Sequence, residues 1–428
     1  MSFLVPNIRR IYGRLIPPPD KSISHRALML SALAQGKSEI KNFLRAEDCL
    51  ATARALKMMG VEIIEEKNNL CVSGQGLFSL KKPSHVLDVG DSGTTLRLLT
   101  GILSAQKFSS VITGGDSLVR RPVKELLYLL RSMGAHVEGH EDDSYPPVHL
   151  YPVTKKLVAI TCKPSTVSAQ IKSALLLAGL YVEGQTVIQE TIHTRDHTER
   201  LLKLFGAAVR EVDSKVQLTP SELQGQSVTI PGDISAASFF ITLALLLPES
   251  ELEVEEVGLN FTRTGFLDVI QAMGATCEID PLIKDSYEPT GRIFVKASPL
   301  KGVTVSKELT IRTIDELPLV ALLATQAHGE TKILDAGNLR FKESDRLKAV
   351  ALELSRLGAH IEEEESGLVI QGPTPLKGAK VKSYHDHRMA MMLMLAGMIS
   401  EGETQIDSIE CISKSFPNFL MVLGKLSE

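Results

Sequence analysis

Residues 126–137 read LLYLLRSMGAHV and contain the pattern that decides the fold. Leu126, Leu130 and Met133 follow the spacing of one helix face, and Gly134 is the small residue at which a helix commonly ends. The residues after the glycine suit a β-strand. This stretch therefore predicts an amphipathic helix that ends at a glycine and leads into a strand.

The same pattern recurs along the chain as KMMGVEI, RSMGAHV, KLFGAAV, QAMGATC and SRLGAHI, with its glycine at positions 60, 134, 206, 274 and 358. A degenerate sixth copy, MVLGKL, contains Gly424. The glycines are 74, 72, 68, 84 and 66 residues apart. A near-constant spacing of this kind indicates a repeated structural unit.

Between these copies lies a second family of helices that are apolar around most of their circumference, such as SAASFFITLALLL. Each starts at a polar turn, and the turns are marked by Lys21, Asp91, Ser168, Asp233, Asp315 and Asp386. These marks define six units of about 71 residues, since the chain has 428. Each unit reads strand, buried helix, strand, amphipathic helix and closing strands, which predicts an α/β fold with mixed sheets.

The last unit reaches the end of the sequence without closing strands, whereas residues 7–16 (NIRRIYGRLI) predict a strand that has no unit of its own. We expect this strand to complete the C-terminal half. Proline and glycine break regular structure on both sides of the middle three units. We therefore expect two similar domains, one of residues 20–230 and one of residues 1–19 plus 233–428, joined by a double-crossover hinge at 17–20 and 230–233. A ligand is expected between them.

The composition excludes several classes of protein. Lys and Arg number 47 against 51 Asp and Glu, and Trp is absent, so a general nucleic-acid binder is not expected. No apolar run reaches the ~20 residues that span a bilayer, and the N-terminus has no signal-like apolar segment. The five cysteines form no C-x-x-C motif and are expected to be free thiols. We expect a cytoplasmic monomer without a membrane or nucleic-acid partner.

Basic residues gather where the helices begin, which is the end of a helix that favours a bound anion. They are Lys21, Arg26, Arg97, Arg120, Arg121, Lys172, Arg195, Arg340, Lys342, Arg346, Arg388 and Lys414. Because arginine binds phosphate and carboxylate through two parallel hydrogen bonds, the set indicates small ligands that carry both groups. The alternative is solvated surface charge or structural ion pairs.

Candidates for acid and base chemistry are Asp233, Asp315, Glu343, Asp345, Asp386 and His387. A carboxylate beside several cations stays ionised and can act as a base. For Asp233 and Asp315, helix capping is an alternative. The sequence has neither an ATP-binding loop nor G-x-G-x-x-G, and it shows no set of residues typical of a catalytic metal site.

The motifs together resemble the 5-enolpyruvylshikimate-3-phosphate synthase family over essentially the whole chain. The segments that carry the resemblance, in order, are DKSISHRAL, DSGTTLRLL, GDSLVRRP, SAQIKSALL, PGDISAA, IDELP, KESDRL, DHRMAM and SFPNF. The resemblance implies two domains, each of three βαβαββ units around a pseudo-threefold axis. It also implies a transferase of the shikimate pathway, which leads to chorismate and the aromatic amino acids.

In the implied reaction, the enolpyruvyl group of phosphoenolpyruvate passes to the 5-hydroxyl of shikimate 3-phosphate, and phosphate is released by addition and elimination through a tetrahedral intermediate. No cofactor and no metal are implied. The implied catalytic residues are Asp315, Glu343 and Lys21. The implied contacts of shikimate 3-phosphate are Lys21, Ser22, Arg26, Ser168, Ala169, Gln170, Arg195, Asp315 and Lys342. Those of phosphoenolpyruvate are Lys21, Gly93, Arg121, Gln170, Arg346, Arg388 and Lys414.

Two positions depart from the pattern of the family: Asp91 and His25 both stand where the family often has Asn. Gly93 keeps the small residue, so we expect inhibition by glyphosate, a compact phosphonate. The nearest alternative is the related enolpyruvyl transferase that acts on UDP-N-acetylglucosamine, which normally has a Cys near the position of Asp116. A non-catalytic repeat scaffold or an RNA-end-processing protein of related topology is the alternative from another class.

Overall fold

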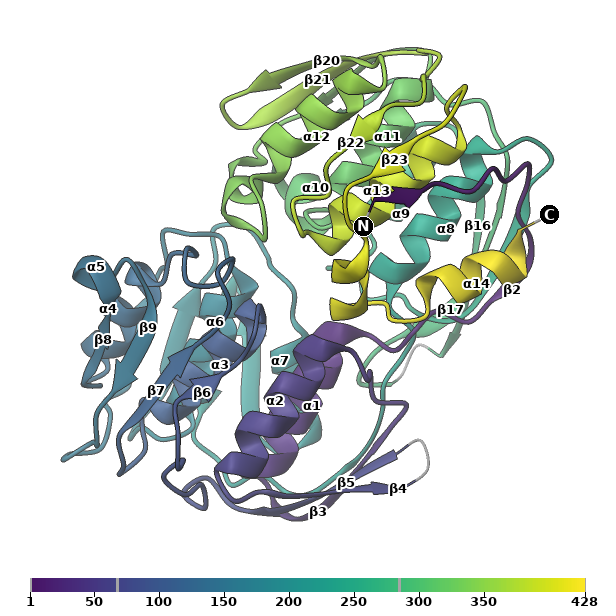
Figure 1. The fold of residues 1–428 in the computed structure, drawn as a ribbon. Helices are drawn as coiled ribbons and strands as arrows, with labels where there is room; N and C mark the ends of the chain where they lie inside the picture. The colour runs from purple at the N-terminus through teal and green to yellow at the C-terminus, as the bar shows by residue number, and fades with distance from the viewer. Residues whose placement is uncertain (1, 67–68, 284–285, 428) are drawn as a thin grey trace. The chain divides into compact units, whose positions relative to one another are not determined.

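The computed structural model describes residues 2–66, 69–283 and 286–427. The chain forms two compact units (Figure 1). One, called the central unit here, is Pro19–Ile230. The other, the terminal unit, combines Met1–Pro18 with Pro231–Glu428.

The central unit contains three sheets with the same strand order, in which the first two strands run parallel and the remaining neighbours antiparallel. The first sheet is β14 (Ser227–Thr229), β3 (Gln35–Lys41), β5 (Asn69–Gln75) and β4 (Glu62–Glu66). The second is β6 (Leu87–Asp88), β7 (Ser110–Thr113), β9 (Tyr145–Leu150) and β8 (Val137–Gly139). The third is β10 (Thr161–Cys162), β11 (Thr186–Gln189), β13 (Lys215–Thr219) and β12 (Ala208–Val212).

The terminal unit repeats this order twice and contains a third, shorter sheet. The two full sheets are β2 (Tyr12–Leu15), β15 (Glu251–Gly258), β17 (Thr290–Lys296) and β16 (Thr276–Ile283), and β18 (Thr304–Val305), β19 (Gly329–Ile333), β21 (Gly367–Gly372) and β20 (His360–Glu364). The short sheet is β22 (Lys380–Val381), β23 (Gln405–Ile406) and β1 (Phe3–Leu4). The expectation of an α/β fold with mixed sheets is confirmed.

Each repeat contributes one inner helix that is buried on nearly all sides. These helices are α1 (Lys21–Leu33), α3 (Gly93–Leu103), α6 (Ala169–Gly179), α8 (Ile234–Leu246), α11 (Leu317–Gln326) and α13 (His387–Met398). In α8, every residue from Ile234 to Leu245 is buried. A helix that is apolar all round is stable only inside a protein, where each fully buried large aliphatic side chain contributes about 1.5–3 kcal/mol.

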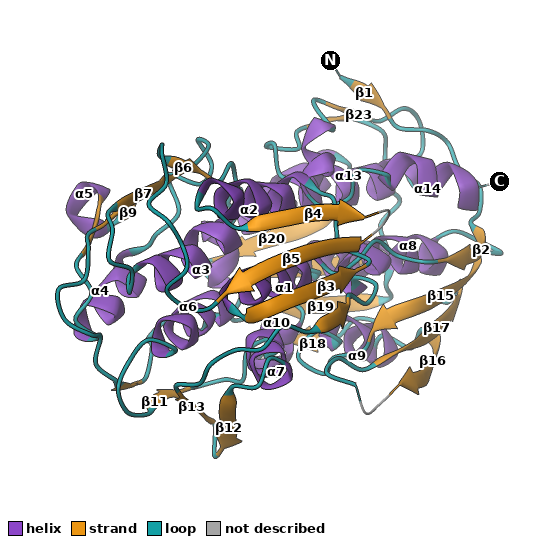
Figure 2. Ribbon diagram, turned by 90° about the horizontal axis from the view of Figure 1, so that it is seen from below, coloured by secondary structure: helices purple, strands orange, loops and turns teal. Residues whose placement is uncertain are grey.

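The outer helices are amphipathic and are α2 (Glu47–Met58), α4 (Lys124–Ser132), α7 (His197–Leu204), α9 (Gly265–Ala272), α12 (Arg346–Arg356) and α14 (Phe419–Leu426). Short helices complete the list: α5 (His140–Asp143), α10 (Lys307–Arg312), η1 (Gly337–Phe341) and η2 (Glu410–Lys414). Figure 2 shows β3, β5 and β4 side by side, with α1 behind them. Among the helices that the structure describes, none is long and apolar enough to cross a membrane.

Five of the six repeated glycines end their helices as predicted. Gly60, Gly134, Gly206, Gly274 and Gly358 all have positive φ, the conformation that glycine adopts without a steric penalty. Gly424 is different, because it lies inside α14. The degenerate sixth copy therefore does not mark a helix end.

The N-terminal segment joins the terminal unit, but not as one strand over residues 7–16. The strand β2 covers only Tyr12–Leu15 and pairs parallel with β15, while β1 pairs antiparallel with β23. The predicted strand over residues 7–16 was too long, because β15 begins at Glu251, opposite Tyr12, and the last contact before it is the hydrogen bond of 3.1 Å from the backbone N–H of Glu251 to the carbonyl of Ile11. In the central unit, β14 completes the first sheet in the corresponding position, parallel to β3.

Candidate functional site

The N-terminus of α1 holds a fixed ammonium group. Asp20 caps the helix by accepting a hydrogen bond of 2.8 Å from the backbone N–H of Ile23. The Lys21 Nζ lies 3.0 Å from Asp48 Oδ2, in the first turn of α2. Both side chains are largely buried, so this charged pair orients Lys21 at the helix start. Sequence reasoning missed Asp48, whose role depends on the packing of α1 against α2.

Arg26 lies one turn further along α1 and is buried. Its guanidinium donates hydrogen bonds to Thr198 Oγ1 at 2.6 Å, to Ser173 Oγ at 2.8 Å and to the carbonyl of Ser22 at 3.0 Å. These acceptors come from α7, α6 and α1. Three elements thus fix the orientation of one guanidinium next to Ser22.

Two further arginines converge on the first residue of α3. A Cβ added to Gly93 would lie 2.9 Å from a terminal nitrogen of Arg97 and 2.9 Å from one of Arg121. Arg97 also donates to Gln170 Oε1 at 3.1 Å, and Gln170 Nε2 donates to Thr94 Oγ1 at 3.0 Å. The starts of α3 and α6 are therefore linked beside two positive charges.

Asp91 is linked to Arg121 through a hydroxyl. Ser117 Oγ donates a hydrogen bond of 2.6 Å to Asp91 Oδ1, and Arg121 donates to Ser117 Oγ at 3.4 Å. Ser117 therefore stands between the Asp91 carboxylate and the Arg121 guanidinium. This departure from the pattern of the family is accommodated by a local hydrogen bond.

Ser168 is the N-cap of α6 and accepts from the backbone N–H of Ile171 at 3.4 Å. It also lines a depression with Lys172, Glu190 and Thr194. Ala169 is the first residue of α6. Arg195 lies between β11 and α7, just before the start of that helix.

The sequence placed Lys172 among the basic residues expected to bind an anionic ligand. In the structure, its charge is instead paired within the protein. Its Nζ lies 3.0 Å from Glu190 Oε1 and 2.6 Å from Glu199 Oε1, and all three side chains are buried. Burial by itself raises the pKa of Glu190, but the hydrogen bond from His193 and the charge of Lys172 lower it to about 2. Lys172 thus belongs to a structural ion cluster, the alternative that the sequence left open.

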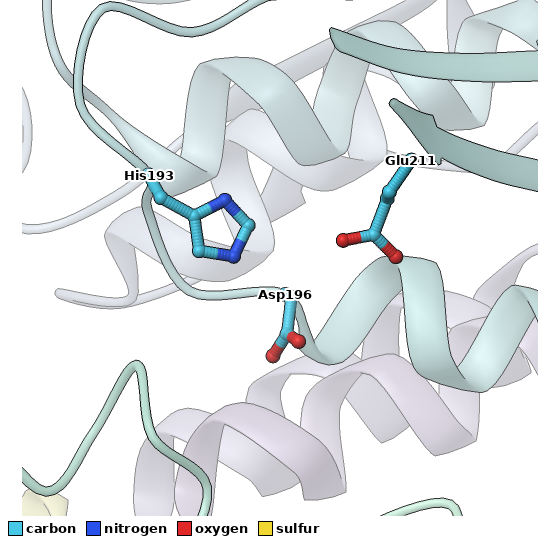
Figure 3. A group of neighbouring side chains, drawn as sticks. All are labelled: His193, Asp196 and Glu211. Carbon is cyan, nitrogen blue, oxygen red and sulfur yellow. The ribbon is translucent and has the colours of Figure 1, made fainter. Parts of the chain in front are cut away.

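Within residues 2–66, 69–283 and 286–427, one group could present metal-ligand atoms to a common point: His193, Asp196 and Glu211, whose atoms lie within 4.8 Å of one another (Figure 3). Each member already has a partner of opposite or complementary charge. His193 Nδ1 lies 3.1 Å from Glu190, Asp196 lies 2.7 Å from Arg200 Nε, and Glu211 lies 2.7 Å from Lys203 Nζ. We assign no metal to this group, because each member already takes part in an ion pair.

In the terminal unit, Arg346 is the centre of a buried charge cluster. Its guanidinium lies 2.7 Å from Asp386, 2.5 Å from Glu343 and 3.5 Å from Asp315, and its side chain is 1 % exposed. Burial alone lowers the pKa of Arg346, but the charges of Asp386 and Glu343 raise it above its usual value. The guanidinium is therefore permanently charged and its orientation is fixed.

Asp386 holds this cluster together. It caps α13 by accepting from the backbone N–H of Arg388 at 2.9 Å, and it also accepts from Ser344 Oγ at 3.0 Å and from Arg346. Burial raises the pKa of the Asp386 carboxyl, but the charge of Arg346 outweighs this and lowers it. One carboxylate thus fixes both a guanidinium and the helix start that carries Arg388.

The Asp315 carboxylate faces three cations. Its oxygens lie 3.6 Å from Lys342 Nζ, 3.5 Å from Arg346 and 3.6 Å from Arg388. The capping alternative was wrong for Asp315, because Glu316 occupies the N-cap position of α11. A carboxylate in this position can accept a proton from a hydroxyl.

Capping is right for Asp233, which accepts from the backbone N–H of Ser235 at 2.8 Å. Arg340 is paired with Asp345 at 3.0 Å and with Glu363 at 2.6 Å, so it also belongs to the structural alternative. Lys414 lies in η2 and donates to the carbonyl of His385 at 3.3 Å.

The residues implied by the resemblance lie in both units. Those of the central unit, here called the central half-site after the expected role, are Lys21, Ser22, Arg26, Gly93, Arg121, Ser168, Ala169, Gln170 and Arg195. Those of the terminal unit, here called the terminal half-site, are Asp315, Lys342, Glu343, Arg346, Arg388 and Lys414. Arg97 is an addition to the first set. The sequence included it among the basic residues, but only its approach to Gly93 gives it a place there.

A family model described as EPSP synthase (3-phosphoshikimate 1-carboxyvinyltransferase) matches residues 5–423. The chain belongs to the EPSP synthase family. It is 46% identical to the 3-phosphoshikimate 1-carboxyvinyltransferase of Thermodesulfovibrio yellowstonii, with 100% of both chains covered. It is also 46% identical to the enzyme of that name from Bacillus licheniformis, with 98% of each covered.

Solved structures agree with this membership. The chain is similar to the EPSP synthase of Acinetobacter baumannii with a TM-score of 0.86 and 38% identity, covering 100% of this chain and 98% of the other. The mixed α/β fold of this EPSP synthase family member is therefore shared along its whole length. The family expected from the motifs is confirmed.

Proposed function

We propose that this chain is a 3-phosphoshikimate 1-carboxyvinyltransferase, which transfers the enolpyruvyl group of phosphoenolpyruvate to the 5-hydroxyl of shikimate 3-phosphate and releases phosphate. The observation that carries the proposal is the environment of Asp315. Its carboxylate has three cations within 3.6 Å, all from segments that resemble the motifs of the family. A carboxylate among cations that attract an anionic substrate is placed to accept a proton from a hydroxyl of that substrate.

The central half-site supplies the proposed contacts of shikimate 3-phosphate through Lys21, Ser22, Arg26, Ser168, Ala169, Gln170 and Arg195, with Asp315 and Lys342 added from the terminal half-site. The buried and oriented guanidinium of Arg26 supports this assignment, since rigid hydrogen-bond donors bind a phosphate or carboxylate at low entropic cost.

The proposed contacts of phosphoenolpyruvate are Lys21, Gly93, Arg121 and Gln170 of the central half-site and Arg346, Arg388 and Lys414 of the terminal one. The space at Gly93, with a guanidinium nitrogen of Arg97 and one of Arg121 each 2.9 Å from the position of a Cβ, fits a compact anion. The absence of a side chain there allows the anion to approach the backbone.

In the proposed reaction, the oxygen of the 5-hydroxyl of shikimate 3-phosphate bonds to C2 of phosphoenolpyruvate, and Asp315 accepts the proton of that hydroxyl. Lys21 or Glu343 donates a proton to the methylene carbon, giving the tetrahedral intermediate. The residue that donated this proton then takes one back from the methyl group, phosphate departs, and the double bond is restored. The fixed cations stabilise the charge that develops on the departing phosphate.

We further propose that residues 17–20 and 230–233 act as a hinge that closes when shikimate 3-phosphate binds. Closure would exclude water and strengthen the electrostatic interactions of the substrates. Small-angle scattering should show a smaller radius of gyration with shikimate 3-phosphate than without it. An unchanged radius would contradict closure. The cytoplasmic location and monomeric state stay predictions, and sedimentation analysis tests the latter.

A phosphate-release assay tests the function directly. The full-length protein is incubated with phosphoenolpyruvate and either shikimate 3-phosphate or UDP-N-acetylglucosamine, and release is expected only with the first acceptor. Arg388→Gln should abolish most of the activity, whereas Arg14→Gln, at an exposed arginine paired with Glu253, should not. Release with UDP-N-acetylglucosamine alone would favour the related enzyme, and no release with either would refute enolpyruvyl transfer to these acceptors.

A further inference from the structure

A chain of buried hydrogen bonds connects three helices of the central unit. His25 Nδ1 lies 2.7 Å from Thr52 Oγ1, Thr52 Oγ1 lies 2.7 Å from Thr95 Oγ1, and Thr95 Oγ1 lies 2.7 Å from Ser92 Oγ. All four side chains are at most 1 % exposed. Because such groups exchange no hydrogen bonds with water, each link depends on the next.

The first link repeats the Lys21–Asp48 ion pair one helical turn further along. His25 follows Lys21 by four residues on α1, and Thr52 follows Asp48 by four residues on α2. Residues four apart lie on the same helix face, so the ion pair and the His25–Thr52 hydrogen bond are successive contacts between the same two helices. The hydrogen-bond network therefore fixes the register of α1 against α2, and with it the position of Lys21.

The last links reach the start of α3. Ser92 is the N-cap of that helix and also accepts from the backbone N–H of Thr95 at 3.2 Å. Gly93 follows Ser92 directly, so the position of the backbone at Gly93 depends on this cap. His25 Nε2 has no hydrogen-bond partner among the described residues, which leaves Nδ1 as the ring atom that joins the network.

The ring also stays neutral. Burial, followed by the charges of Lys21 and Arg26, lowers the pKa of His25 well below its usual value. A neutral imidazole can donate or accept at Nδ1, so either orientation of the hydroxyl protons along the chain is possible.

We propose that His25, Thr52, Thr95 and Ser92 form a positioning network that sets the distance between Lys21 and Gly93, and with it the affinity for phosphoenolpyruvate. The inference rests on the proposed function. None of the four needs to touch a substrate for this role. Gly93 is a proposed contact of phosphoenolpyruvate alone, whereas Lys21 is a proposed contact of both substrates. Arg26, a proposed contact of shikimate 3-phosphate, is held by Thr198 and Ser173 outside the network, so the network acts on phosphoenolpyruvate more than on shikimate 3-phosphate.

The test removes the middle hydroxyl with Thr52→Val, which keeps the shape of the side chain. We expect the KM for phosphoenolpyruvate to rise about tenfold, while the KM for shikimate 3-phosphate, which shares Lys21 but not Gly93, rises by a smaller factor. Thr52→Ser retains the hydroxyl and should restore the KM for phosphoenolpyruvate. His25→Leu removes the first hydrogen bond of the network and provides a second variant if Thr52→Val does not fold.

Thr100→Val is the matched control. Thr100 is a fully buried residue of α3 whose hydroxyl donates to the carbonyl of Leu96 at 2.7 Å, outside the network. It should lower the melting temperature without changing either KM. Equal effects of Thr52→Val and Thr100→Val on the KM for phosphoenolpyruvate, or no effect of either, would overturn the inference. A wild-type protein without phosphate release would instead refute the proposed function, on which the inference depends.

Discussion

Gly93→Ala should weaken the binding of phosphoenolpyruvate without destabilising the fold. The added Cβ would lie 2.9 Å from a nitrogen of Arg97 and from one of Arg121, closer than Cβ atoms approach other atoms in real structures. To reach an ordinary contact, both guanidinium groups must move by about 0.5 Å, which takes donors out of hydrogen-bond range of a ligand placed between them.

The magnitude follows from the hydrogen bonds at risk. One hydrogen bond to a charged group is worth about 1.5–3 kcal/mol, and 1.4 kcal/mol corresponds to a tenfold change in affinity. We therefore expect the KM for phosphoenolpyruvate to rise by about 10-fold to 100-fold. Stability should be unchanged or slightly higher, because Gly93 is helical without a positive φ and alanine is favoured over glycine in a helix by up to about 1 kcal/mol.

Initial rates of phosphate release at varied phosphoenolpyruvate, together with thermal unfolding, provide the measurement. Gly424→Ala is the control, since Gly424 is also helical and no atom lies within 4 Å of its added Cβ. It should raise the melting temperature slightly and leave the KM unchanged. A KM within twofold of wild type for Gly93→Ala would refute the reasoning that the two arginines bind the substrate at this position.

Four further predictions concern the charge cluster and the inhibitor. Asp315→Ala should lower kcat far more than it raises the KM for either substrate, and similar losses in both parameters would indicate a positioning role instead. Asp386→Asn should lower the midpoint of urea unfolding and raise the KM for phosphoenolpyruvate. The reason is that breaking the buried ion pair between Asp386 and Arg346 costs about 3–5 kcal/mol. An unchanged midpoint would contradict this. The pKa of the Asp386 carboxyl is lowered in the folded state. Its contribution to stability is therefore complete above the pKa of the unfolded state, about 3.9, and is lost as the pH falls through the pKa of the folded state. In unfolding measured against pH, Asp386→Asn should reduce this loss of stability at acidic pH. Glyphosate should inhibit the wild-type enzyme, and full turnover at millimolar concentrations would show that the site at Gly93 does not accept it.

The elements of the fold could be predicted because their signals are local. Gly134 and its four counterparts with positive φ end helices through their own backbone conformation, which needs no distant partner. The uniformly apolar sequence of α8 likewise requires burial wherever the helix packs. The N-terminal segment was the exception, because the sequence could not show that β1 and β2 pair with different sheets.

The cations illustrate what the sequence left open. Lys172 and Arg340 are cationic and lie near helix starts, as Arg121 and Arg388 do. The fold surrounds Lys172 with Glu190 and Glu199, which lie 18 and 27 residues away in the chain. A charge is neutralised by what lies within a few ångströms of it, and sequence separation does not give that distance.

By itself, the sequence determined the repeat, the helix and strand types and the family, because periodicity, glycine positions and motifs are properties of short segments. Only the tertiary structure decided which of two plausible roles each charged residue has. Asp315 faces three cations and does not cap α11, and Asp48 and Asp386 hold Lys21 and Arg346 in place. These roles depend on contacts between elements far apart in the chain, and electrostatic and hydrogen-bond energies are set by distance and burial in three dimensions.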